Sequence, residues 1–153
     1  MKLRHALAAC ACLLSLAAAR SVLRAQESTA TETRSVWDGV YTEEQAKRGE
    51  ALYQKECKGC HGVALAGGES APPLTGGAFL SNWNGLTLGD LFERIRKTMP
   101  QNALGKLNRQ QNADVLAFVL SANKFPRGKV ELSRQAEFLK EIRFEAVRPE
   151  QKK

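Results

Sequence analysis

Residues that can bind a metal through sulfur or imidazole are scarce in this sequence. Its 153 residues include four cysteines, two histidines and two methionines, and half of each set lies within the first twelve residues. Beyond that stretch only Cys57, Cys60, His61 and Met99 remain. A structural zinc site built on a Cys-x-x-Cys pair needs two further ligands. After residue 12, His61 is the only cysteine or histidine besides the Cys57/Cys60 pair, so the four ligands of a zinc site are not available.

Long apolar runs are also missing. The longest, Ala6–Ala19, is shorter than the roughly 20 residues that span a membrane, and it follows a short basic start, Met1–His5. Small residues suited to cleavage lie at Ala17–Ala19 and at Ala25. This pattern predicts a signal peptide over residues 1–25 and export to a periplasm. The alternative is a retained membrane anchor; otherwise we expect no transmembrane segment in the mature chain.

The sequence has no basic run interleaved with aromatic residues, which argues against nucleic-acid binding. The predicted signal peptide holds four basic residues and no acidic one, so its removal lowers the formal charge from +7 to +3. A mildly basic surface of this kind favours an acidic protein partner.

No internal repeat and no alternating strand pattern is present, so we predict an all-α fold. Three segments carry apolar residues at helical spacing, each after a residue able to cap a helix. The predicted helices are 43–56 after Thr42, 88–98 after Thr87, and 109–123 after Asn108. Thr42–Gln45 matches a capping box, in which the Gln45 side chain reaches back to the cap.

The composition divides the remaining chain into further regions. Residues 26–41 are polar and predict a flexible leader, and residues 42–126 form the predicted domain. Within it, residues 62–86 are rich in Gly and Pro and predict a long loop. Residues 127–153 form a charged C-terminal extension with a short predicted helix over 133–142. Three side chains of the leader can dock on the domain: Trp37, Val40 and Tyr41.

Cys57-Lys58-Gly59-Cys60-His61 is a CxxCH sequence, typical of covalent c-type haem attachment. Cysteines three positions apart lie on one side of a helical turn, so their thiols can bond two vinyl groups on one porphyrin edge. The next residue, rotated by about 100°, can aim the His61 imidazole at the iron. A redox dithiol is the alternative, but the strand–helix alternation of thioredoxin-like folds is missing. The motif therefore predicts one covalently attached haem c.

Few side chains could serve as the second axial ligand of the haem iron. His5 lies in the predicted signal peptide, and Met99 is the only methionine besides the initiator. Met99 is therefore the leading candidate, with an open sixth position, or Lys or Tyr ligation, as alternatives. An open position predicts a haem-based sensor or a peroxidase-like protein. A haem-free interaction module is the remaining hypothesis.

Residues 43–123 resemble the class I, mitochondrial-like cytochromes c, through the CxxCH, the Pro-containing loop, Met99-Pro100 and the final helix. The resemblance implies a cytochrome c-like fold, with three main helices and a long Gly/Pro-rich loop around one haem. It implies that the first and last helices pack near perpendicularly, through Gly49 and Tyr53 against Val115 and Phe118.

The same resemblance implies two further haem contacts. The Pro72 carbonyl would accept a hydrogen bond from the proximal imidazole, and Trp83 would contact a haem propionate. Plain core packing is the alternative role for Trp83.

A narrower resemblance concerns partners. Several short stretches look like cytochromes that accompany or are fused to quinoprotein dehydrogenases, which use pyrroloquinoline quinone. These stretches are Ala71–Leu74, Phe79, Trp83, Thr87–Leu91, Thr98–Pro100 and Phe125–Pro126. The resemblance implies a non-enzymatic electron carrier that accepts electrons from a dehydrogenase and passes them to a terminal oxidase or another cytochrome.

Overall fold

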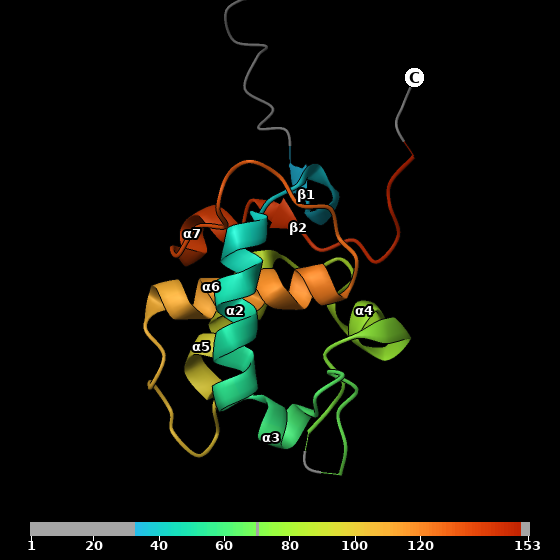
Figure 1. Cartoon of the computed structure of the whole chain (residues 1–153). Helices are drawn as coiled ribbons and strands as arrows, with labels where there is room; N and C mark the ends of the chain where they lie inside the picture. Colours follow the sequence, from blue (N-terminus) through green and yellow to red (C-terminus); the bar gives the residue numbers. More distant parts are fainter. Residues whose placement is uncertain (1–32, 70, 151–153) are drawn as a thin grey trace, which may run out of the picture. The chain divides into compact units, whose positions relative to one another are not determined.

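A computed structural model of the chain describes residues 33–69 and 71–150. Within these residues the protein is mainly helical, with six α-helices, one short 3-10 helix and a single pair of two-residue strands (Figure 1). The predicted all-α class is therefore confirmed. None of the described helices has the length and apolar character needed to cross a bilayer. The predicted signal peptide and residues 26–32 of the leader lie outside the described residues.

The three main helices occur where the sequence predicts them. They are α2 (Glu43–Glu56), α5 (Leu88–Thr98) and α6 (Arg109–Ala122). The side chains of Thr42, Thr87 and Asn108 each accept a hydrogen bond from a backbone amide in the first turn. Capping satisfies an amide that has no partner inside the helix.

The capping box predicted at α2 is wrong in one respect. The Gln45 side chain does not reach back to Thr42; its amide nitrogen donates to the Leu132 carbonyl at 3.0 Å, and its oxygen accepts from the Leu132 amide. Gln45 is fully buried, so both of its polar atoms need partners, and the C-terminal segment provides them.

Helices α2 and α6 cross at a small residue, with α2 in front of α6 in Figure 1. A Cβ on Gly49 would lie 1.8 Å from the Asp114 carbonyl oxygen and 2.9 Å from Cβ of Phe118. One turn later, the Tyr53 and Phe118 rings lie 5.3 Å apart. The two helix backbones touch because glycine has no side chain at the crossing.

A helix interrupts the predicted long loop over residues 62–86. Helix α4 (Gly76–Trp83) occupies the second half of this range, after Thr75. Its two leading glycines have poor helix propensity, which is why composition indicated a loop. Tertiary packing outweighs that propensity: Phe79 is buried, and its ring meets the Phe144 ring edge-on at 5.9 Å.

The part of the predicted leader that the structure describes packs on the domain. Strand β1 (Arg34–Ser35) pairs in parallel with β2 (Ile142–Arg143), and a 3-10 helix, η1 (Val36–Asp38), follows. Val40 and Tyr41 are buried, and Trp37 packs partly buried against the same core. These apolar side chains give a polar segment enough buried surface to fold.

The C-terminal extension also packs against this core. The predicted helix over 133–142 is shorter, α7 (Ala136–Leu139), and β2 follows it. Phe144 is fully buried, donates its amide to the Leu86 carbonyl and accepts from the Gly85 amide, each at 2.8 Å. The extension thereby holds the turn between α4 and α5.

Candidate haem site

The CxxCH motif lies at the lower end of α2 in Figure 1, where the one-turn helix α3 (Lys58–His61) continues the chain. Cys57 joins the two helices and is half-buried, Cys60 is exposed, and His61 is 7% exposed. The His61 amide donates to the Cys57 carbonyl at 3.0 Å. The motif therefore forms the helical turn that haem attachment requires, with both thiols free.

The buried imidazole of His61 has one nitrogen engaged. Its Nδ1 lies 2.9 Å from the Pro72 carbonyl oxygen. A carbonyl only accepts hydrogen bonds, so Nδ1 carries a proton, and in the neutral imidazole Nε2 then has the lone pair. This is the arrangement in which a histidine binds a metal through Nε2.

The loop that carries Pro72 is tied to the motif by backbone hydrogen bonds. The Gly67 amide donates to the His61 carbonyl at 3.0 Å, and the Leu74 amide donates to the Leu65 carbonyl at 2.8 Å. At the start of the loop, the Tyr53 hydroxyl donates to the Gly62 carbonyl at 2.6 Å. These hydrogen bonds hold the loop that carries Pro72 against His61, the residue directly after Cys60.

The two remaining predicted residues lie at helix ends. Trp83 is the last residue of α4, half-buried, with its ring 6.4 Å from that of Phe79. Met99 caps the C-terminus of α5, half-buried, and donates its amide to the Ile95 carbonyl at 2.9 Å. The predicted roles of both side chains remain predictions.

The acidity of the Cys57 thiol does not favour a redox dithiol. Burial, together with the nearby Glu56 carboxylate, raises the pKa of the Cys57 thiol to about 11. Redox dithiols need the opposite, a lowered thiol pKa. No three His, Cys, Asp or Glu side chains gather as a metal site within residues 33–69 and 71–150.

Several partly buried apolar side chains are of the kind that suits a porphyrin. They come from the end of α2, the Pro72 loop, α4 and α5, and each packs against the core while keeping part of its surface accessible. They are Cys57, Leu74, Leu80, Trp83 and Ile95. A porphyrin has apolar faces, and pockets for such groups are lined mainly by apolar side chains with a few placed polar groups. The CxxCH turn and the His61 imidazole bonded to the Pro72 carbonyl therefore fit a haem.

A family model described as cytochrome c oxidase, cbb3-type, subunit III, matches residues 44–119, about half of the chain. The match runs from α2 through the CxxCH and Met99 into α6. The chain is a class I c-type cytochrome. The family binds haem c covalently and transfers electrons, and this cytochrome is accordingly a haem c electron carrier.

No curated protein matches the cytochrome. Among solved structures, it is similar to a chain of the sulfane dehydrogenase SoxCD from Paracoccus pantotrophus. The two share 20% sequence identity with a TM-score of 0.49, over 75% of this chain and 62% of that one. The cytochrome thus spans less than two thirds of that chain's length.

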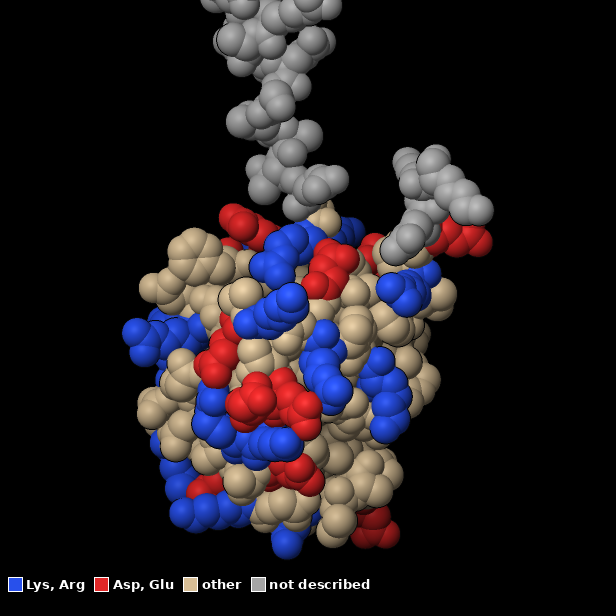
Figure 2. Space-filling model, turned by 45° about the horizontal axis from the view of Figure 1, so that its top comes forward, with Lys and Arg blue, Asp and Glu red and all other residues tan. Residues whose placement is uncertain are grey.

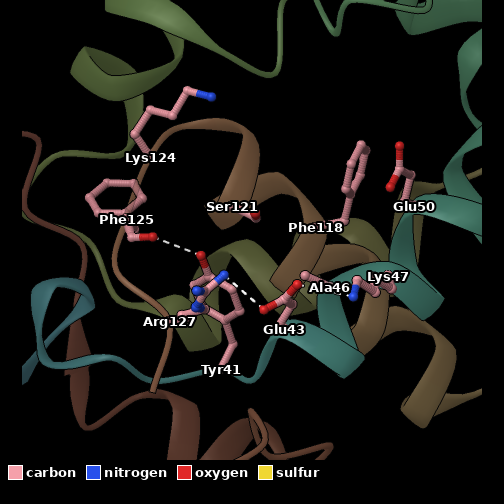
Figure 3. A pocket seen from close by; sticks show the side chains of 10 residues that line it. All are labelled: Tyr41, Glu43, Ala46, Lys47, Glu50, Phe118, Ser121, Lys124, Phe125 and Arg127. Carbon is pink, nitrogen blue, oxygen red and sulfur yellow. Dashed lines mark hydrogen bonds and ion pairs between the residues drawn. The ribbon is translucent and has the colours of Figure 1, made fainter. Parts of the chain in front are cut away.

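A pocket of about 510 Å³ lies away from the CxxCH, where the start of α2 approaches the end of α6 (Figure 3). None of the six predicted haem residues lines it.

At the haem site, sequence reasoning missed one polar group, the Tyr53 hydroxyl, because Tyr53 was considered only as a packing residue. A usable signal was its type: a buried tyrosine hydroxyl needs a hydrogen-bond partner, whereas phenylalanine does not.

Proposed function

We propose that the cytochrome is a periplasmic, single-haem carrier of one electron, with His61 and Met99 as the axial ligands of the iron. One observation carries this proposal. His61 is buried directly after two cysteines on a helical turn, and its Nδ1 is bonded to the Pro72 carbonyl at 2.9 Å. That arrangement leaves Nε2 as the donor atom for iron.

Each site residue has a defined role in this proposal. The Cys57 and Cys60 thiols would hold the porphyrin through two thioether bonds, each thiol adding its hydrogen and sulfur across one vinyl group. His61 and Met99 supply imidazole and thioether ligands, Pro72 orients the imidazole, and Trp83 contacts a propionate. When bound, the haem supplies reversible one-electron chemistry between ferrous and ferric iron.

The proposed partners are redox proteins. The stretches between Ala71 and Pro126 that resemble cytochromes of quinoprotein dehydrogenases support such a dehydrogenase as electron donor, and a terminal oxidase or another cytochrome as acceptor. Figure 2 shows Lys and Arg interspersed with Asp and Glu on the face that it presents.

The experiment compares two double variants, each produced with haem-attachment machinery and extracted with acidified acetone. We expect wild type to keep its haem, and the Cys57→Ala/Cys60→Ala variant to lose it completely because no thioether bond can form. The control, Cys10→Ala/Cys12→Ala, changes only cysteines of the predicted signal peptide and should keep the haem. Haem that resists extraction from the Cys57→Ala/Cys60→Ala variant would contradict the proposal.

A further inference from the structure

We propose that Tyr53 is a positioning residue for the proximal ligand: its hydroxyl fixes the backbone directly after His61 and so holds the imidazole against Pro72. This inference rests on the proposed role of His61. It begins from a hydrogen bond between α2 and the loop, in which the Tyr53 hydroxyl donates to the Gly62 carbonyl at 2.6 Å.

The bond holds a point where the chain turns sharply. Gly62 follows His61 with a φ of +77°, a conformation that side chains rarely adopt, and the chain leaves α3 there. Its carbonyl also accepts from the Leu65 amide, at the longer distance of 3.3 Å. The Tyr53 hydroxyl is thus the shorter of the two described contacts at this carbonyl.

From Gly62 the contacts lead to the imidazole. The Gly67 amide closes the first part of the loop on the His61 carbonyl, and the loop then presents the Pro72 carbonyl to Nδ1. His61 and Pro72 therefore lie in one segment, residues 61–72, and the Tyr53 hydroxyl connects this segment to α2. Without the hydroxyl, the segment can shift and the bond to Nδ1 lengthens.

Packing alone does not account for a tyrosine here. The ring contact with Phe118 would be equally available to a phenylalanine. The Tyr53 side chain is 0% exposed, and burying a hydroxyl is unfavourable unless it is hydrogen-bonded. The contact with Gly62 satisfies the hydroxyl, and it lies next to the proposed iron ligand.

Loss of the hydroxyl has a predictable effect on the iron. A hydrogen bond from Nδ1–H makes the imidazole a stronger donor through Nε2, which favours ferric iron. When that bond weakens, ferric iron is less stabilised, so the midpoint potential rises. A purely structural role would lower thermal stability without moving the potential.

The test compares Tyr53→Phe with Tyr41→Phe in the haem-loaded, full-length protein. Tyr41 is a matched control because it is also buried, at 3% exposure, and its hydroxyl donates to the Phe125 carbonyl at 2.7 Å (Figure 3). It lines the pocket away from the CxxCH. Each variant removes one oxygen and one tyrosine-to-carbonyl hydrogen bond.

Redox titration followed by visible absorption should give an upward shift of the midpoint potential for Tyr53→Phe and none for Tyr41→Phe. The thermal midpoint should fall in both. Equal potentials in the two variants, or a downward shift in Tyr53→Phe, would overturn the inference. Failure of the proposed function is distinguishable, because wild type itself would then lack haem resistant to acidified acetone.

Discussion

Met99→Ala is expected to leave the haem covalently attached and to lower its midpoint potential by a sizeable part of the ~0.8 V range that axial ligands span. A thioether favours ferrous iron, whereas the water or hydroxide that replaces it favours ferric iron. Met99 directly follows the last residue of α5 and is half-buried, so the helix fixes the position of its backbone. Redox titration measures the shift, and extraction with acidified acetone checks the attachment.

Leu104→Ala is the matched control for this variant. Leu104 lies five residues further along the same connection between α5 and α6 and is 65% exposed, so its truncation should leave the potential unchanged. A Met99→Ala protein with the wild-type potential would remove Met99 as a ligand. Cyanide binding to the ferric protein would then test for an open sixth position, as in a sensor or peroxidase-like protein. If that position is open, the wild type and the Met99→Ala variant should bind cyanide equally readily.

Gly49→Ala is expected to lower the free energy of unfolding by more than about 3 kcal/mol, the upper end of usual overpacking costs. Its Cβ would lie 1.8 Å from the Asp114 carbonyl oxygen, which is backbone and cannot rotate away. The α2–α6 crossing must therefore open, and the Tyr53–Phe118 contact beside it is lost. Urea denaturation followed by circular dichroism measures the change.

The control for this variant is Gly77→Ala in α4. A Cβ there has no atom within 4 Å, and the residue does not adopt a left-handed conformation. Alanine is the better helix former by up to about 1 kcal/mol, so this variant should be as stable as wild type or slightly more stable. If the two alanine variants have the same stability, the close crossing of α2 and α6 is not a determinant of the fold.

Local signals were sufficient to predict the helices that dominate this fold. Both α2 and α5 begin after a capping threonine and have the predicted limits, because caps and apolar spacing are properties of neighbouring residues. Helix α4 was missed because it depends on Phe144, which lies far along the chain. Strands β1 and β2 were missed for a similar reason: each exists only through its partner, which lies more than 100 residues away along the chain.

At the haem site, too, only the features set by neighbouring residues could be predicted directly from the sequence. The CxxCH turn could be predicted because its five residues are consecutive. The His61–Pro72 contact was implied by family resemblance and is present in the structure. The Tyr53 hydroxyl could not be assigned, because spacing on α2 identifies a packing face but does not reveal which carbonyl a hydroxyl meets. The roles of Trp83 and Met99 depend on the bound haem and remain predictions.

The most direct test is the visible and near-infrared absorption spectrum of the purified protein in both redox states, after production with haem-attachment machinery. The account predicts split, sharp bands in the reduced protein and a sulfur-to-iron charge-transfer band in the oxidised protein, together indicating low-spin haem c ligated by His61 and Met99. Haem c bands without the charge-transfer band would contradict the Met99 ligation, and a protein with no haem spectrum at all would contradict the central claim.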